Sequence, residues 1–222
     1  MREIVLDTET TGLSPNDGHR IVEIGCIELV NHVATGNTYH QYLNPERPMP
    51  EEAQAIHGLT EEFLAGHPVM ADAADAFLEF IGDATLVIHN AEFDVRFLNA
   101  ELGMLGHPPI PMERAVDTVR LAREKFPGAP ASLDALCRRF EIDNSSRSLH
   151  GALLDAQLLA EVYLELVGGR QPDLALKAEK GATVQVREAG ERRPPRPHAA
   201  SDEELAAHTE FLKKIADPVW SG

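Results

Sequence analysis

The sequence predicts an α/β protein in which a mixed five-stranded sheet is flanked by helices. Three β-rich segments follow one another near the N-terminus, at residues 3–8, 20–30 and 35–44, and this arrangement favours an antiparallel meander. Beyond residue 84, short apolar runs alternate with helical patterns, as is typical of parallel strands joined by helices. The 222 residues, of which 43% are hydrophobic, are enough for a buried core of this kind.

Turn signals separate the predicted strands. Residues 12–18, which include Gly, Pro and Asn-Asp, form a turn after the first strand, and residues 31–34 (Asn-His-Val-Ala) join the second strand to the third. A proline-rich stretch at residues 45–50 ends the meander. Two further short strands are predicted at residues 85–89 and 115–118, which gives the sheet its fifth strand.

Helical periodicity covers most of the chain around these later strands. Asn90 and Ser132 each precede a helical segment and are predicted N-caps, and Asp117 is predicted to cap a helix that follows it. Gly168-Gly169 ends the last helix of the core. The other predicted helical segments are 51–65 in short pieces, 71–81, 92–105, 133–140 and 152–167.

The composition of the chain changes after residue 170. Residues 177–200 have no hydrophobic periodicity and include an Arg-Arg-Pro-Pro-Arg-Pro run, which is typical of a flexible linker. Ser201 then opens a capping-box pattern and a short helix, which Asp217-Pro218 is predicted to end. The predicted organisation is therefore a globular domain followed by a flexible C-terminal tail, with boundaries at 1–170, 171–176, 177–200 and 201–222.

The chain is strongly acidic, with 20 Lys and Arg against 36 Asp and Glu and a net charge of −16. Because proteins that hold nucleic acid by charge alone present a basic surface, any activity on DNA or RNA must rely on bound metals or on partners. Cys26 and Cys137 have apolar neighbours and are expected to be buried thiols in a reducing compartment. No apolar run is long enough for a signal peptide or a membrane span, so we expect an intracellular protein.

Two acids end the first strand, directly after the apolar run Ile4-Val5-Leu6. Residues two apart in a strand point to the same face, so the carboxylates of Asp7 and Glu9 lie side by side. Such a pair shares a proton, is solvated or binds a cation, and a hard divalent ion suits oxygen ligands. Taken alone, the two acids are equally well explained as a solvated strand end.

Two later segments also carry acids. Asp94 lies in the first turn of the helix predicted after Asn90, where an acid is ordinary. Asp155 lies early in the last core helix among leucines, with His150 just before that helix. A partly buried carboxylate at position 155 needs a partner, which a metal ion supplies. No special role is predicted for six other histidines: His19, His32, His67, His107, His198 and His208.

Together, these segments resemble the three exonuclease motifs of the DEDD superfamily in its histidine-containing branch, DEDDh. Asp7 and Glu9 match the first motif, Asp94 the second, and His150 with Asp155 the third, which has the form His-x-Ala-x-x-Asp. The tyrosine branch needs Tyr four residues before the final Asp, where this chain has Gly. The resemblance covers residues 1–170 and implies a ribonuclease H-like fold and 3′→5′ hydrolysis of phosphodiesters.

The resemblance also implies two divalent cations, Mg²⁺ or Mn²⁺, and a role for each motif residue. Asp7 would bridge both ions, Glu9 and Asp155 would complete one site, and Asp94 would support the second ion directly or through water. His150 would be the general base that takes a proton from the attacking water, since an imidazole titrates near neutral pH. Two ions roughly 3.5–4 Å apart stabilise the attacking and leaving oxygens of an in-line displacement.

Within the DEDDh branch, the chain is most similar to the proofreading epsilon subunits of bacterial DNA polymerase III. Glu52 and His57 match positions that contact the terminal nucleotide in those proteins, and Phe93 is expected to stack near that nucleotide. Asp7 and Glu9 would contribute to the same substrate site. The alternatives are a solvated acid for Glu52 and a core aromatic for Phe93.

The tail resembles partner-binding segments of the same subunits. Gln171, Leu174 and Leu176 match a short peptide that bacterial proteins insert into the sliding clamp. The terminal helix with Trp220 resembles the segment that docks on the polymerase alpha subunit. The alternative for both segments is packing on the chain's own core. A flexible linker of this length spans roughly 25–30 Å, so a tethered nuclease stays at an effective concentration on the order of millimolar.

The function predicted from this resemblance is proofreading, in which mispaired 3′-terminal nucleotides are released as 5′-monophosphates at the cytoplasmic, nucleoid-associated replisome. The expected partners are single-stranded or frayed DNA 3′ ends, the alpha subunit, the sliding clamp and a small accessory subunit. One alternative is a stand-alone nuclease of the ribonuclease T or oligoribonuclease kind, which would not need the tail. The other is a polymerase–clamp tether with a vestigial nuclease site, against which the complete motif set argues.

Overall fold

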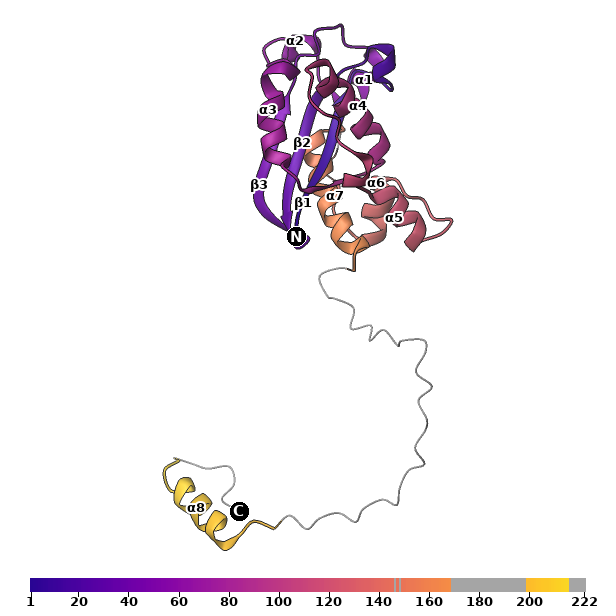
Figure 1. Ribbon diagram of the computed structural model, residues 1–222. Coiled ribbons are helices and arrows are strands. Elements are labelled where there is room, and N and C mark those ends of the chain that lie inside the picture. Colours follow the sequence, from indigo (N-terminus) through magenta and orange to yellow (C-terminus); the bar gives the residue numbers. More distant parts are fainter. Residues whose placement is uncertain (146, 148, 169–198, 216–222) are drawn as a thin grey trace, which may run out of the picture. The chain divides into compact units, whose positions relative to one another are not determined.

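The computed structural model describes residues 1–145, 147, 149–168 and 199–215 (Figure 1). They fall into two parts, a domain up to residue 168 and a separate helix after residue 198. The strands are β1 (Arg2–Thr10), β2 (Ile21–Val30), β3 (Val33–Tyr42), β4 (Thr85–Ile88) and β5 (Ala115–Asp117). The α-helices are α1 (Glu51–His57), α2 (Glu61–Leu64), α3 (Met70–Ile81), α4 (Ala91–Met104), α5 (Thr118–Lys125), α6 (Leu133–Phe140), α7 (Ala152–Leu166) and α8 (Asp202–Leu212).

The strands of the described domain form one five-stranded sheet in the order β3-β2-β1-β4-β5. β1 pairs antiparallel with β2, and β2 with β3, whereas β4 pairs parallel with both β1 and β5. The predicted mixed sheet is thus confirmed, with the meander on one side and the parallel strands on the other. Because β1 lies at the centre, its carboxyl end is next to the start of the helix that follows β4.

The link between β2 and β3 is shorter than the sequence predicts. Val30 pairs with Val33, so the turn contains only Asn31 and His32 and not the four residues 31–34. These two residues have φ values of 52° and 65°, as a type I′ hairpin turn requires. The usual sequence signal for this turn is Asn-Gly or Asp-Gly, so the His at the second position concealed it.

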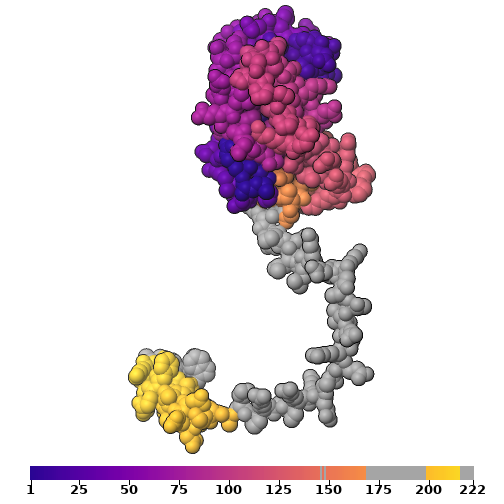
Figure 2. All heavy atoms as spheres, in the orientation of Figure 1, coloured from indigo at the N-terminus to yellow at the C-terminus, as the bar shows by residue number. Residues whose placement is uncertain are grey.

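Helices cover both faces of the sheet, as Figure 1 shows. On one face, Ile4 and Leu6 of β1 pack with α3 and α4, and on the other face Val5 packs with α5, α6 and α7. Side chains of β1 therefore alternate between two buried layers, as expected for a central strand. On the face of the molecule seen in Figure 2, only a small part of α7 is visible, and many residues of that helix are buried.

Gly25 lets α7 lie directly against the sheet. A Cβ atom at this position would be 2.3 Å from the backbone of both Ala152 and Leu153, which is far closer than atoms can approach. Gly25 is also the residue on β2 that lies opposite Asp7 on β1. The absence of a side chain at position 25 therefore brings the first turns of α7 close to the carboxyl end of β1.

Two of the three predicted helix caps are confirmed. The Ser132 side chain accepts a hydrogen bond from Ala135 N–H, and the Asp117 side chain accepts one from Val119 N–H. Asn90 precedes α4 but is not a side-chain cap, because it has φ 68° and makes no capping bond. Its own N–H donates to Asp117 instead, at 3.2 Å.

The structure also bears on the cysteines, on membrane-spanning helices and on the C-terminal helix. Cys26 and Cys137 are free and buried. Among the described helices, none has the length and apolar character that crossing a membrane requires. Ser201 forms the predicted capping box with Glu204, but α8 ends at Leu212, before the predicted stop. The residues proposed for partner binding lie outside the described residues: Gln171, Leu174, Leu176 and Trp220.

Candidate active site

Asp94 lies at the carboxyl end of the central strand because α4 begins directly after β4. Its Oδ1 accepts hydrogen bonds from Thr8 N–H at 3.0 Å and from the Thr8 hydroxyl at 2.7 Å. The side chain is only 3% exposed. The second acidic segment of the sequence is thereby fixed to the first, with Thr8 between Asp7 and Glu9 as the point of attachment.

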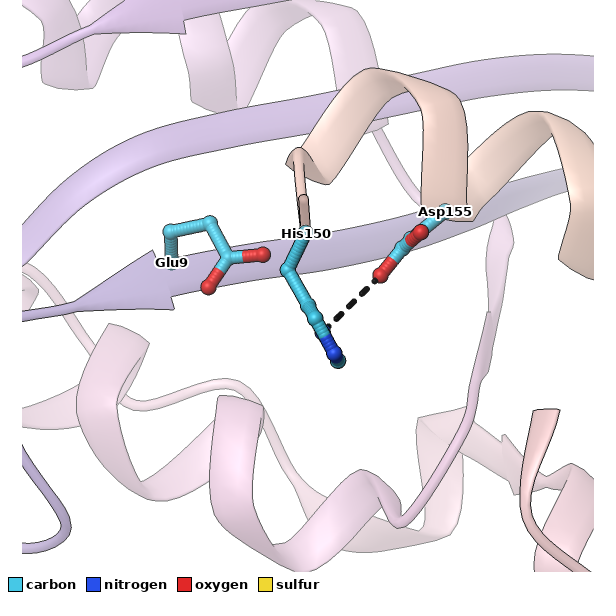
Figure 3. A group of neighbouring side chains, drawn as sticks. All are labelled: Glu9, His150 and Asp155. Carbon is cyan, nitrogen blue, oxygen red and sulfur yellow. Dashed lines mark ion pairs between the residues drawn. The ribbon is translucent and has the colours of Figure 1, made fainter. Parts of the chain in front are cut away.

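Asp155 reaches the same place from α7. Figure 3 shows Glu9 on β1, His150 just before α7 and Asp155 in the first turns of α7, with their side chains converging. One potential ligand atom from each of these residues lies within 4.8 Å of the others. His150 Nδ1 is 3.4 Å from Asp155 Oδ2, and the His150 side chain is 48% exposed. This cluster combines buried carboxylates with an imidazole that solvent can reach.

The five motif residues share one cavity. Its volume is about 460 Å³, and its lining includes Asp7, Glu9, Asp94, His150 and Asp155. The sequence placed these residues on three segments far apart along the chain, and the structure brings all five together. Four carboxylates around one space are a hard, oxygen-rich donor set of the kind that Mg²⁺ and Mn²⁺ prefer.

Burial, together with the charges of nearby acids, raises the pKa values of three of these carboxyl groups. Burial raises the pKa of Asp7 well above its usual range, and the charges of Asp94 and Glu9 raise it further. Burial, together with Asp155 and Glu23, raises the pKa of Glu9 to about 8. Burial also raises the pKa of Asp94, although its hydrogen bonds from Thr8 oppose the change. A bound divalent cation would reverse this tendency to hold protons, so the residues present fit a metal site.

A second cavity of about 570 Å³ adjoins the first and contains the residues predicted to contact the nucleotide. Glu52, His57 and Phe93 line it together with Glu9. Phe93 also packs on Phe97, with ring centroids 5.0 Å apart, so it serves the core and faces the cavity. Glu52 is exposed, which agrees with either of its predicted roles.

His57 presents an unused hydrogen-bond donor in this second cavity. Its Nδ1 accepts from Leu59 N–H at 3.0 Å, which places the imidazole proton on Nε2. Nε2 is buried and has no partner among the described residues. Burial lowers the pKa of His57, which favours the neutral ring, although the nearby Thr10 backbone opposes this change. A buried donor without a partner in a cavity wall is suited to a ligand acceptor.

Sequence reasoning missed Arg147, which lies in the middle of the site. Its guanidinium donates to both oxygens of Asp155, at 2.5 and 2.6 Å, and to Asp134 at 2.8 Å. It also donates to His150 Nδ1 at 3.0 Å. The only sequence signal was a single Arg in the polar stretch before His150.

Glu23, His40 and His19 were also missed. Glu23 lies opposite Glu9 in the sheet, is 3% exposed and contacts His40 Nε2 at 2.7 Å. The available signal for Glu23 was an acid between the apolar residues Val22 and Ile24. His19 lines the second cavity, with Nδ1 3.1 Å from the Thr11 hydroxyl. The sequence predicted no special role for His19, and its position beside the nucleotide residues was not foreseen.

Several solved structures share this fold. Exonuclease X in complex with 5′ overhanging duplex DNA matches with a TM-score of 0.59 and 29% identity, covering 74% of this chain and 90% of that one. The nuclease domain of 3′hExo, a DEDDh family member bound to rAMP, matches with a TM-score of 0.64 and 17% identity, covering 75% and 91% of the two chains. The match to the second structure confirms the predicted ribonuclease H-like fold.

Sequence relatives extend over nearly the whole chain. The family model described as Exonuclease matches residues 4–163. The DNA polymerase III subunit epsilon of Rickettsia felis is 52% identical over 228 residues, covering 97% of each chain. The subunit of the same name from Escherichia coli K12 is 48% identical, covering 96% of this chain and 93% of that one. This chain therefore belongs to the DNA polymerase III epsilon-subunit family of DEDDh exonucleases.

Proposed function

We propose that this chain, a 3′→5′ exonuclease subunit of DNA polymerase III, hydrolyses the last phosphodiester of a frayed DNA 3′ end in the cavity at the carboxyl end of β1. The observation that carries the proposal is the convergence of four carboxylates and one exposed imidazole in this cavity. The products are a 5′-monophosphate and a DNA end shortened by one nucleotide. An unpaired or mispaired end is the preferred substrate, because separating it from its template costs least.

Two divalent cations, Mg²⁺ or Mn²⁺, fit the four carboxylates. Asp7, whose charge interacts with those of the other three, would contribute to holding both ions, with Glu9 and Asp155 at one and Asp94 at the other. When bound, the ions activate the attacking water and stabilise the charge that develops on the leaving oxygen. The hydrogen bonds that Thr8 donates to Asp94 hold this carboxylate beside β1 before any ion arrives.

His150 is suited to accept the proton of the attacking water. It lies at the rim of the cavity, half exposed, and its backbone N–H donates to Ile56 O at 3.1 Å, which ties the residue to α1. Because solvent reaches this imidazole, it can pass the accepted proton to water between turnovers.

The second cavity is suited to the terminal nucleoside. His57 Nε2–H would donate to an acceptor on the sugar or base, and Phe93 would provide an apolar face for stacking. Glu52 lies at the same cavity, where its carboxylate can accept a hydrogen bond from a hydroxyl of the terminal sugar. These contacts would place the scissile phosphate next to Asp7 and Glu9.

The proposal for partners extends to the tail. Gln171, Leu174 and Leu176 would bind the sliding clamp, and the terminal segment with Trp220 would bind the polymerase alpha subunit at the replisome in the cytoplasm, with a small accessory subunit as a further partner. What supports the tail assignments is the sequence pattern, together with relatives that match over nearly the whole chain. The exposed Leu205 and Phe211 of α8 agree with a helix that binds a partner.

Asp7→Asn tests the assignment directly. This variant keeps the size of the side chain but removes the charge on which both ions would depend. We therefore expect Mg²⁺-dependent release of 5′-monophosphates from single-stranded DNA to fall by at least about a thousandfold. Glu62→Gln, which removes an exposed acid from α2, is the matched control and should keep wild-type activity. Undiminished hydrolysis by Asp7→Asn would refute the active-site assignment.

A further inference from the structure

Arg147 takes the place of a cation in the proposed metal site. Its guanidinium engages both oxygens of Asp155, and its side chain is only 8% exposed. A bidentate Arg–carboxylate pair that is removed from water has the best geometry available to such contacts. Among the described residues that line the first cavity, Arg147 is the one Lys or Arg. It therefore supplies the positive charge that the cluster of carboxylates otherwise lacks.

A metal ion and this guanidinium compete for the same oxygens. Arg147 already donates to both oxygens of Asp155, which leaves only one lone pair on each oxygen for a divalent ion. An ion bound there would also lie within a few ångströms of a like charge in a partly desolvated cavity, where repulsion is strong. This repulsion sets the two cations in competition for Asp155.

We propose that Arg147 is a positioning residue that holds Asp155 in the metal-free chain and must be displaced when a divalent ion binds. This inference rests on the proposed role of Asp155 as a metal ligand. Asp134 provides an alternative partner, since its side chain is 50% exposed and already accepts from the same guanidinium. Displacement also removes the bond from Arg147 to His150 Nδ1, which frees the imidazole for proton transfer.

Competition of this kind weakens the observed metal affinity by a predictable factor. When only a fraction of the molecules has Asp155 free, the apparent dissociation constant equals the intrinsic constant divided by that fraction. If Arg147 covers Asp155 in about nine molecules of ten, its removal strengthens metal binding about tenfold. A purely structural role for Arg147 predicts no such gain.

The test is Mn²⁺ binding to the full chain, measured from the electron paramagnetic resonance signal of free Mn²⁺. We expect Arg147→Gln to bind Mn²⁺ about tenfold more tightly than the wild type. Arg138→Gln is the matched control, because Arg138 lines an adjoining cavity with Arg147 but is exposed and forms no ion pair with another described residue. Its affinity should stay within about threefold of the wild type. Arg147→Lys, which keeps the charge, should also stay close to the wild type.

Thermal unfolding provides a second measurement. Without metal, Arg147→Gln leaves Asp155 without its partner and should unfold at a lower temperature than the wild type. Saturating Mn²⁺ should bring the two midpoints together, because the ion then compensates Asp155 in both. An equal deficit with and without Mn²⁺ would show that Arg147 is needed for the fold alone and would overturn the proposal.

Nuclear magnetic resonance of the wild type covers the case in which Arg147→Gln does not fold. The Nε–H signal of Arg147 should be protected from exchange with water in the metal-free chain and should lose that protection at saturating Mg²⁺. An unchanged signal would overturn the proposal. Asp155→Asn separates the two ideas. If this variant binds Mn²⁺ as well as the wild type does, the proposed metal site is wrong. If it binds Mn²⁺ more weakly but Arg147→Gln does not bind more tightly than the wild type, only the competition with Arg147 is wrong.

Discussion

The metal-free chain should become less stable as the pH rises, and Glu9 should be a main cause. Its pKa is about 8 in the folded chain, against its usual value near 4.5. A group whose pKa is raised by folding binds its proton more tightly in the folded state than in the unfolded state. Its contribution to stability is therefore present at low pH and is lost as the pH rises through the folded pKa. Asp7 and Asp94 have raised pKa values and change the stability in the same direction.

The size of the effect follows from the pKa of Glu9. Each unit of pKa difference corresponds to about 1.4 kcal/mol, so between about pH 5.5 and about pH 8 the free energy of unfolding should fall by roughly 3 kcal/mol through Glu9 alone. Glu9→Gln replaces the carboxyl group with a neutral one of the same size. The variant should therefore be more stable than the wild type at about pH 8 by roughly this amount, and close to it at about pH 5.5.

The assay is urea unfolding in EDTA, followed by circular dichroism at the two pH values. Glu62→Gln is the control and should keep the pH dependence of the wild type. Added Mg²⁺ should stabilise the wild type more at the higher pH, because metal binding requires ionised carboxylates, and should stabilise Glu9→Gln much less. The reasoning would be refuted if the metal-free wild type were equally stable at both pH values, or if Glu9→Gln lost stability with pH as the wild type does.

Three further predictions concern the packing of α7, the nucleotide cavity and the tail. Gly25→Ala should displace α7, lower the free energy of unfolding by about 1–3 kcal/mol and reduce activity at least tenfold. Gly103→Ala, which adds a methyl group in open space on α4, is the control and should be neutral or stabilising. Equal stability of the two variants in urea unfolding would show that α7 does not depend on Gly25. His57→Ala should raise KM for single-stranded DNA about tenfold through loss of one hydrogen bond, and steady-state kinetics with KM and kcat unchanged would remove His57 from the substrate site. Deleting residues 201–222 should leave nuclease activity intact but abolish binding to the alpha subunit in surface plasmon resonance, and retained binding would refute the docking role.

The sequence predicts the strands and the motif acids well because both depend on local patterns. The apolar run before Asp7 specifies a buried strand, and the two-residue period of a strand places Glu9 on the same face. His150 and Asp155 are recognisable because they lie on one helix and its approach. For the same reason, the two-residue turn at Asn31 was mispredicted, since its sequence lacks the usual Gly.

The residues that sequence reasoning missed act through contacts between distant segments. Gly25 matters because α7 packs on it, which no pattern around residue 25 reveals. Glu23 gains its importance from lying opposite Glu9 on the neighbouring strand, and Arg147 from meeting Asp155 across the cavity. The unused donor of His57 follows from a hydrogen bond that fixes its tautomer. Such features require the register of the sheet and the packing of the helices to be known.

The charge of the site bears on how DNA can enter it. Five carboxylates line the first cavity, and Arg147 pairs with two of them, Asp155 and Asp134. Under the proposed function, such a site would attract divalent cations and repel a bare phosphate, so we expect DNA to enter only after metal has reversed the local charge. Binding of metal before substrate would then explain how an acidic protein can act on DNA.

The most direct test of the central claim is an anomalous diffraction map from crystals of the chain grown with Mn²⁺ and a nucleoside 5′-monophosphate. The account predicts two manganese peaks in the cavity at the end of β1, both beside Asp7, with Glu9 and Asp155 at one and Asp94 near the other, and the nucleoside in the adjoining cavity against His57. A map with no manganese among these carboxylates would contradict it.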